Sequence, residues 1–413
     1  MNNAVLSQRM QTQLRRRHAA EKRFRWYGAA ALCFALAFLF VLLATIIFNG
    51  AGVFIHKRML FEVAVSEHHG DRYGAMIKDS WKAQFPEVTN RRQRRELYGL
   101  ISRDAEFLLR EHLAGVSVPD NGIVVLSVPF SGDAGEFLET DPEKRDAFSE
   151  RLSPEQRGWL ERIEASGQVE TVFNKDFFLN ADSREPEIAG ILGALIGSML
   201  TMCVTFLFSF PIGVMAAIYL EEFAAKGRLF RFIEVNINNL AAVPSIVFGL
   251  LGLAVFIGLF GVPRSTPLVG GLVLGLMTLP TMIIATRAAL QAVPSSLRYA
   301  ALALGATPTQ ALLHQGLPAA MPGIFTGAII GMAQALGETA PLLMIGMVAF
   351  VADIPDGFTS ASTALPVQVF LWADSPERGF VEKTSAAILV LLAFLAVMNS
   401  AAIYLRRKFE IKW

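Results

Sequence analysis

The sequence predicts a mainly α polytopic membrane protein with about six transmembrane helices and an inserted α/β domain outside the membrane. Two observations lead to this fold class. Apolar residues, counted with Gly and without Tyr, make up about 60% of the 413 residues, against about 45–50% in soluble domains. Charge is also uneven, because residues 49–187 hold 18 Lys/Arg and 25 Asp/Glu whereas residues 235–352 hold four charged side chains. The chain therefore joins a charged segment to an apolar one.

The overall charge and the cysteines exclude several classes of protein. A net charge of +1 gives no reason to expect a nucleic-acid partner, and the balance of signs excludes a long acidic or basic disordered tail. Cys33 and Cys203 both lie inside apolar runs, so no disulfide framework is expected.

The first membrane span is predicted at residues 26–48, after a basic N-terminal segment of residues 1–25. A cleaved signal peptide also begins with basic residues, but its apolar core is only about 7–15 residues long. The apolar run here is longer, and no small-residue cleavage site follows Phe48. We therefore interpret this segment as an uncleaved span.

Five further spans are predicted, at residues 188–220, 235–260, 267–286, 322–351 and 385–405. An even total places both chain ends on the same side of the membrane. Seven Lys/Arg precede the first span, and Arg406, Arg407, Lys408 and Lys412 follow the last. Because basic residues favour the cytoplasmic side, residues 1–25 and the tail 406–413 are predicted to be cytoplasmic in an inner-membrane, multi-pass protein.

Residues 49–187 then form the extracytoplasmic α/β domain. Apolar spacing predicts a helix over Arg91–Leu113, and Ser153 followed by Pro154 predicts the start of a second helix. Runs of β-branched residues predict strands at residues 123–128 and 169–173, with a turn at Asp120, Asn121 and Gly122 before the first.

No catalytic arrangement emerges from this domain. His68, His69 and Asp71 could bind a metal, but no third and fourth ligands follow at helix or hairpin spacing, so a solvated loop is the better interpretation and no metal site is predicted. The basic cluster Arg91–Arg95 could attract an anion, although a solvated helix face is the simpler interpretation.

Prolines and polar side chains within the later spans favour a translocation pathway over a plain anchor. Pro211, Pro244, Pro280 and Pro341 break or border spans, which membranes tolerate where other helices or a water-filled cavity satisfy the freed carbonyls. The polar residues could equally form hydrogen bonds between packed helices. Glu338 differs, because a carboxylate near the middle of the span 322–351 is costly and by default marks a functional site.

The most specific pattern lies between the fourth and fifth spans, in residues 287–321. Arg298–Ala306 contains Ala-Ala-x3-Gly, and Leu317-Pro318 follows after eleven residues. This pattern predicts a short helix, a break at Gly305 and a second short helix over Thr309–His314. The small residues Ala300 and Ala301 would permit the close approach of a partner's surface.

This segment resembles the cytoplasmic loop of type I ATP-binding-cassette (ABC) importer permeases, with Tyr299 where the family has Glu and Gln315 where it has Ile. The segment Gly337–Leu343, which reads Gly-Glu-Thr-Ala-Pro-Leu-Leu, is similar to the phosphate permeases of the PstA family. The resemblance runs from Ile188 to the C-terminus. Relatives often carry Arg at the position of Gln334.

The resemblance implies that residues 188–405 form a type I ABC importer permease core and that the chain is a permease rather than an enzyme. It implies a second permease (PstC), two copies of an ATPase (PstB), an extracytoplasmic binding protein (PstS), inorganic phosphate and membrane lipid as partners. The chain has no P-loop motif, so ATP would be used by the ATPase, and no cofactor is expected on this chain. The residues implied in ATPase coupling are Arg298, Tyr299, Ala300, Ala301, Gly305, Ala306, Leu317 and Pro318.

The residues assigned to the pathway or its gating are Glu338, Thr339, Gln334, Arg287, Thr201, Thr205, Asn236 and Asn239. Glu338 is expected in a salt bridge, with Arg287 as first candidate and an Arg of the second permease as the other. Three alternatives remain: a permease for another oxyanion such as molybdate or sulfate, an ion-coupled secondary transporter, and a membrane-anchored extracytoplasmic sensor.

Overall fold

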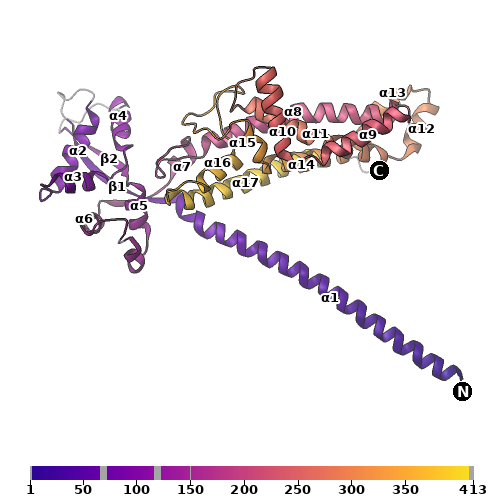
Figure 1. Ribbon diagram of the computed structural model, residues 1–413, viewed down its shortest axis with the longest axis horizontal. Coiled ribbons are helices and arrows are strands. Elements are labelled where there is room, and N and C mark those ends of the chain that lie inside the picture. Colours follow the sequence, from indigo (N-terminus) through magenta and orange to yellow (C-terminus); the bar gives the residue numbers. More distant parts are fainter. Residues whose placement is uncertain (1, 66–71, 116–121, 149, 409–413) are drawn as a thin grey trace.

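The computed structural model describes residues 2–65, 72–115, 122–148 and 150–408. A small domain with a three-stranded sheet lies at one end of a bundle of long helices (Figure 1). The C-terminal part of the last helix lies toward the opposite end of the bundle, near the short helices α12 (Ser295–Ala303) and α13 (Pro308–Ala311). The mainly α fold class with one small sheet is confirmed.

The first helix, α1 (Asn2–Ala51), extends away from the bundle and contacts it only near its C-terminal end, where it meets α17 (Gly379–Lys408) (Figure 1). Gly50 permits this contact, because a Cβ atom there would lie 2.8 Å from the backbone nitrogen of Ala386. The apolar side chains of the predicted span, such as Phe34 at 76% exposure, are uncovered along its length. A surface of this kind needs lipid or another protein around it.

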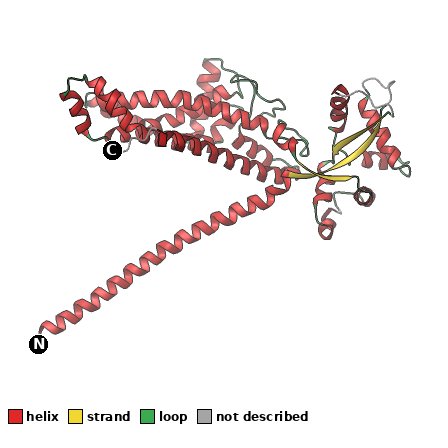
Figure 2. Cartoon of the chain, turned by 180° about the vertical axis from the view of Figure 1, so that it is seen from behind, coloured by secondary structure: helices red, strands yellow, loops and turns green. Residues whose placement is uncertain are grey.

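The sheet of the inserted domain is antiparallel, with the order β2-β1-β3 (Figure 2). The structure has strands at the two predicted places, as β2 (Ile123–Pro129) and β3 (Val169–Phe173). The central strand β1 (Ile55–Ala64) was not predicted. Its buried side chains are Met59, Phe61 and Val63, which alternate with more exposed neighbours, and this period of two was the signal available in the sequence.

Helices cover this sheet and close its core. Their bounds are α2 (Tyr73–Gln84), α3 (Arg91–Tyr98), α4 (Ala105–Gly115), α5 (Gly132–Glu139) and α6 (Pro154–Ala165), with a 3-10 turn at Pro142–Phe148. The short helix α7 (Lys175–Leu179) and the 3-10 turn Gly52–Phe54 instead bury Phe177 and Val53 with side chains of the bundle. Trp81 lies at the centre, with its ring 5.5 Å from that of Phe61 and its Nε1 donating to the carbonyl of Leu97 at 2.8 Å. The helix predicted at Pro154 is present, with a capping box made by Ser153 and Gln156.

The single helix predicted over Arg91–Leu113 is wrong, because the structure divides it into α3 and α4. Between them the backbone pairs with the chain that leaves β2: the nitrogen of Ser102 donates to the carbonyl of Pro129, and the nitrogen of Ser131 donates to that of Leu100. These long-range bonds replace helical ones. The candidate ligands His68, His69 and Asp71, and the turn residues Asp120 and Asn121, lie outside the described residues.

Within the described residues, five helices are long and apolar enough to span a membrane, or six if one bent pair counts as a span. Besides α1 and α17, they include α8 (Leu192–Ile218), which continues as a π-helical turn over Tyr219–Phe223, and α11 (Pro267–Gln291). The fifth runs over Pro308–Gly337 and contains α14 (Leu317–Gly337). The short helices α15 (Ala340–Met344) and α16 (Leu365–Ala373) complete the bundle.

The segment predicted as a span at residues 235–260 is bent in the structure. It is a bent pair, α9 (Arg228–Ala241) followed by Ser245–Leu259, with an angle of 100° between the two parts. The second part is α10 (Ser245–Gly252) continued by a π-helical stretch over Leu253–Leu259. Pro244 lies at the bend, where its missing N–H and fixed φ prevent a continuous helix.

Small residues bring the central helices of the bundle together. A Cβ atom on Gly271 of α11 would lie 2.4 Å from the Cβ of Val204 on α8, and one on Gly327 of α14 would lie 2.3 Å from that of Ala285 on α11. These helices pack so closely because glycine stands at the contact, as is common within membranes. The packed α8–α11–α14 core holds the segment between α11 and α14 at one end of the bundle.

Candidate functional site

The segment between α11 and α14 forms a compact projection at the end of the bundle. It consists of α12 (Ser295–Ala303), a turn at Gly305, and α13 (Pro308–Ala311), which continues as a π-helical turn over Leu312–Gly316. Gly305 has φ of +89°, a conformation that favours glycine. Thr307 caps α13 and forms a capping box with Gln310. The predicted pattern of helix, glycine break and helix is therefore present, with the second helix starting at Pro308.

The surface of this projection is small, uncharged and open. Leu304 is 90% exposed and Tyr299 is 68% exposed. Beside them is a shallow hollow whose lining includes Ala300, Ala301, Ala306 and Gln310. An exposed leucine at the edge of a hollow lined in part by alanines can contact a complementary surface of another protein.

Arg298 joins this projection to the bundle. Its guanidinium forms an ion pair with Glu222, on the π-helical turn that ends α8, and its Nη2 donates to the carbonyl of Leu290 at 3.1 Å. Both ion-pair side chains are largely shielded, with 24% exposure for Arg298 and 16% for Glu222. This ion pair therefore joins α12 to the end of α8.

A second charged contact lies beside the first. Arg287 of α11 faces Glu221 on the same π-helical turn, with Nε 3.4 Å from Oε2, and Glu234 of α9, with Nη2 3.0 Å from Oε1. Gln291 also donates to Glu221 at 2.9 Å. Three carboxylates from α8 and α9 thus fix two arginines. The sequence motifs indicated roles for the two arginines but not for Glu221, Glu222 or Glu234. The adjacent pair Glu221-Glu222 at the end of an apolar run could have indicated that these arginines have carboxylate partners.

These contacts overturn Arg287 as the partner of Glu338. Gly323 and Gly327 of α14 face Ala289 and Ala285, so Arg287 is level with that turn of α14. Glu338 lies eleven residues beyond Gly327, or about 16 Å along a helix. The Arg287 guanidinium is already paired with two carboxylates, and Glu338 lies too far along α14 to contact it.

Glu338 itself does not lie within a continuous span. The predicted span 322–351 is broken, since α14 ends at Gly337 and Glu338 has extended backbone angles (φ −89°, ψ 118°) before α15 begins. Pro341 explains the break, because its ring would clash with the carbonyl of Gly337 in a continuous helix. Glu338 and Thr339 are half-buried and Gln334 is exposed. In the described part of the chain, Glu338 forms no salt bridge.

The remaining predicted pathway residues lie in two different environments. Thr201 and Thr205 are buried where α8 packs on α11, and the hydroxyl of Thr205 donates to the carbonyls of Thr201 (2.9 Å) and Gly271 (3.2 Å). Asn236 and Asn239 are exposed on α9. The structure does not bring these four side chains together, and the hydroxyl of Thr205 forms the interhelical hydrogen bond that was the alternative interpretation.

Two sequence families match the chain. The family described as "Binding-protein-dependent transport system inner membrane component" matches residues 209–411, and a "Domain of unknown function" matches residues 11–117. The first covers the helical bundle from within α8 onward. The second covers α1 and the first part of the inserted domain.

Known proteins resemble about half of the chain. The chain is 32% identical over 217 residues to the phosphate transport system permease protein PstA 1 of Mycobacterium tuberculosis, covering 52% of this chain and 70% of that protein. It is 29% identical over 229 residues to PstA of Pasteurella multocida, covering 54% and 79%. Among solved structures, an inward-facing MetNI methionine ABC transporter matches with 19% identity and a TM-score of 0.44, over 54% of this chain and 95% of that one.

Proposed function

The chain belongs to the PstA-like permeases, which are binding-protein-dependent transport system inner membrane components, and we propose that it is the permease subunit of an ATP-driven importer of inorganic phosphate. Family membership makes it a multi-pass inner-membrane transporter permease and not a catalytic enzyme. The observation that carries the choice of phosphate is the 32% identity over 217 residues to a phosphate transport system permease.

The projection Arg298–Pro318 is proposed to dock on a separate ATPase. Its exposed, uncharged surface of Leu304 and small residues suits seating in a groove of another protein. Closure of an ATPase dimer on ATP would displace α12, and the ion pair between Arg298 and Glu222 would pass that movement to α8. ATP would be bound and hydrolysed by the ATPase.

The complete importer would contain further subunits, named by analogy as the second permease PstC, two copies of the ATPase PstB and the binding protein PstS. The uncovered apolar surface of α1 supports burial in lipid or against a second permease. Both chain ends and the docking projection are proposed to be cytoplasmic, with the inserted domain on the opposite side, because the basic residues cluster at the chain ends.

The pathway is proposed to pass the break between α14 and α15. Glu338 and Thr339 lie there on a non-helical turn, with Gln334 in the last turn of α14 just before it. Membranes tolerate such a turn where backbone lines a cavity or is covered by protein. A lone carboxylate would repel a phosphate dianion. Glu338 is therefore proposed to pair with an arginine of the second permease, which would supply positive charge at the pathway.

Reconstitution tests this function. Proteoliposomes that contain this chain, the second permease, the ATPase and the binding protein should accumulate radiolabelled phosphate only when ATP is supplied to the ATPase side. Excess unlabelled phosphate should compete, whereas excess molybdate or sulfate should not. Competition by either oxyanion would reassign the substrate, and ATP-independent uptake would indicate a secondary transporter. A complex that never moves phosphate but whose ATPase still responds to the binding protein would favour a sensor.

A further inference from the structure

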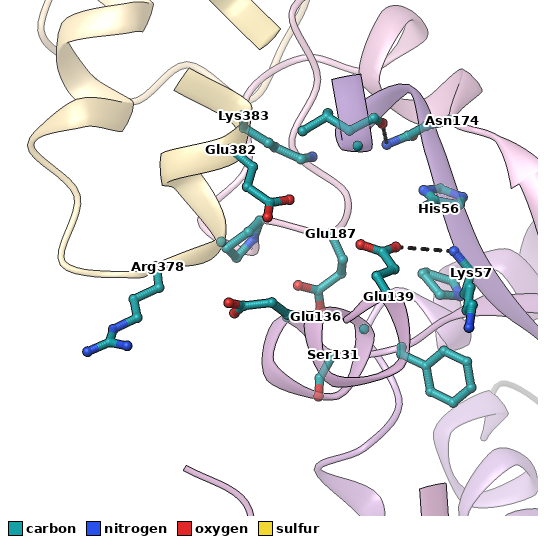
Figure 3. A pocket seen from close by; sticks show the side chains of 18 residues that line it. His56, Lys57, Ser131, Glu136, Glu139, Asn174, Glu187, Arg378, Glu382 and Lys383 are labelled. Atoms are coloured by element: carbon teal, nitrogen blue, oxygen red, sulfur yellow. Dashed lines mark hydrogen bonds between the residues drawn. The ribbon is translucent and has the colours of Figure 1, made fainter. Parts of the chain in front are cut away.

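A cavity of about 90 Å³ separates the inserted domain from the helical bundle, large enough for several water molecules. Its walls come from β1, α5, the connection before α8 and the first turn of α17 (Figure 3). Figure 3 shows Glu139 and Glu187 of the domain side and Glu382 of α17 around the same space, while the side chains of Glu136 and Arg378 point away from Glu139. Carboxylates of the domain thus meet a carboxylate of a membrane helix across this cavity.

Most cations near these carboxylates are paired elsewhere. The ammonium of Lys57 lies 2.9 Å from Glu164 and donates to the carbonyl of Leu138 at 2.8 Å. Arg151 lies 2.6 Å from Glu136 and so neutralises that member of the group. Arg58 is similarly paired with Asp176 at 3.0 Å.

Glu139 and Glu382 are left facing each other across the boundary between the two parts. Neither forms a salt bridge within the described residues; Glu139 accepts one hydrogen bond, from the backbone nitrogen of Lys57 at 3.2 Å. Both glutamates are exposed to solvent at this cavity. The protein around the Glu139 carboxyl desolvates it in part and raises its pKa to about 7, and the charge of Glu382 acts in the same direction.

Lys383 is the buried cation of this group, with 5% exposure. Its ammonium donates to the carbonyl of Ala189 and lies 5.9 Å from the centre of the Phe177 ring. The carboxylates of Glu187, Asp176, Asp182 and Glu139 surround it at longer range. Asp182 is held by the indole nitrogen of Trp372 at 2.9 Å, and burial raises the pKa of both Asp182 and Glu187.

The pH dependence that His56 gives to opening of the cavity is opposite to that of the carboxyls. Desolvation, together with the charge of Arg58, lowers the pKa of His56 to about 4. Opening of the cavity would let His56 take up a proton more easily, which favours opening as the pH falls. Ionisation of Glu139 favours opening as the pH rises. A test must therefore separate the two groups.

We propose that this cavity is a proton-sensitive joint, through which the inserted domain holds α17 when Glu139 is protonated and releases it when Glu139 and Glu382 are both ionised. The fold places the joint where it can act on the bundle. Gly379, at the start of α17, lies so close to the connection before α8 that a Cβ atom there would be 2.8 Å from the Cβ of Pro186. The effect on transport, though not the joint itself, rests on the proposed function.

Hydrogen exchange of the full chain in nanodiscs tests the joint. The measured quantity is the opening of peptides 132–139 and 379–387 at pH 6 and pH 8, corrected for the intrinsic rates and compared between wild type and Glu139→Gln. Gln keeps the oxygen that accepts from Lys57 but cannot ionise. From the pKa of about 7 against an ordinary value of 4.5, the ratio of opening in wild type to opening in the variant should rise by up to about tenfold over this interval. The contribution of His56 is common to both proteins and cancels.

Two further variants complete the design. Glu139→Asp keeps a carboxyl group and should retain the pH dependence, whereas Glu143→Gln removes an exposed carboxylate on the 3-10 turn Pro142–Phe148 and should match wild type throughout. A constant ratio between wild type and Glu139→Gln from pH 6 to pH 8 would overturn the joint.

The transport arm is kept separate. In the reconstituted importer, phosphate uptake by Glu139→Gln should change less between pH 6 and pH 8 than uptake by wild type. If no protein transports phosphate, the proposed function fails while the exchange ratio still decides the joint. If uptake is normal and the exchange ratio is flat, the joint alone is wrong.

Discussion

The helical bundle carries a group of charged side chains at each end, and the two groups are built differently. At the end with α12 and α13, Arg287 and Arg298 each form ion pairs with carboxylates of α8 or α9. At the end that meets the inserted domain, Glu139 and Glu382 face each other without a salt bridge in the described part of the chain, and Lys383 is buried behind them.

We call the end with the arginine ion pairs the rigid end, because its charges do not change with pH, and the end that meets the inserted domain the adjustable end, because the charge of Glu139 does. Arginine stays protonated at any physiological pH, so an arginine–carboxylate pair transmits movement without responding to protons. At the other end, partial desolvation raises the pKa of Glu139 to about 7, so the charge of this carboxyl changes near neutral pH. The first arrangement suits the transfer of force from a docked partner, and the second suits regulation.

The largest expected effect comes from breaking the rigid end. Arg298→Ala leaves Glu222 shielded and without its cation, which costs roughly 1–3 kcal/mol for a partly exposed pair. ATP-driven uptake by the reconstituted importer should fall about tenfold to a hundredfold, while the exchange Glu222→Arg with Arg298→Glu should recover part of the loss. The exposed Arg264→Ala is the matched control and should be neutral. Normal uptake by Arg298→Ala would show that the pair transmits nothing.

A somewhat smaller loss is expected from Gly305. Its φ of +89° costs an ordinary side chain about 1–2 kcal/mol, and nothing lies within 4 Å of the position a Cβ would occupy, so a leucine there would project into the docking surface. Gly305→Leu should lower both ATPase co-purification and uptake about tenfold. Gly305→Asn, which tolerates positive φ, should lose less. Equal behaviour of the two variants would argue against a role for the backbone turn.

Glu338 is another carboxylate without a salt bridge in the described residues, but we propose that an arginine of the second permease pairs with it. Because it is half-buried at the α14–α15 break, Glu338→Gln should reduce uptake severalfold, roughly 1 kcal/mol, by removing a partner from an arginine of the second permease. Its loss should add to that of Arg287→Gln, since Arg287 is paired with Glu221 and Glu234. A double-mutant cycle on uptake provides the measurement. Strong coupling between the two would contradict the separation seen here.

The last effect concerns stability, not uptake, and is confined to the domain end of the bundle at acid pH. The pKa of His56 in the folded chain, about 4, lies below its ordinary 6.5, so its contribution to stability is complete above pH 6.5 and is lost as the pH falls through 4. Partial exposure reduces this linkage to about 1–2 kcal/mol. Thermal unfolding followed by tryptophan fluorescence should show the loss in wild type and a weaker one in His56→Gln. If the unfolding temperature of wild type and of His56→Gln falls equally between pH 6.5 and pH 4, groups other than His56 cause the loss.

Local patterns in the sequence predicted much of the architecture. The apolar runs identified the long helices, and Ser153 with Pro154 marked the start of α6. Ala300, Ala301 and Gly305 marked the two short helices of the docking projection. These features depend on neighbours within a few residues, so composition and spacing contain them. The central strand β1 also had such a signal, in its alternation of buried and exposed residues, and it was missed.

The sequence by itself determined what depends on local chemistry: which segments are apolar enough for a membrane, where proline and glycine interrupt them, and which side chains carry charge. Only the tertiary structure decided which charges meet. Glu222 and Arg298 are 76 positions apart in the chain, yet they form an ion pair because α8, α11 and α14 pack through glycine contacts. Glu139 and Glu382 face each other only because the inserted domain folds against the start of α17. Electrostatic energy depends on distance in space, and distance in space follows from packing rather than from the order of residues.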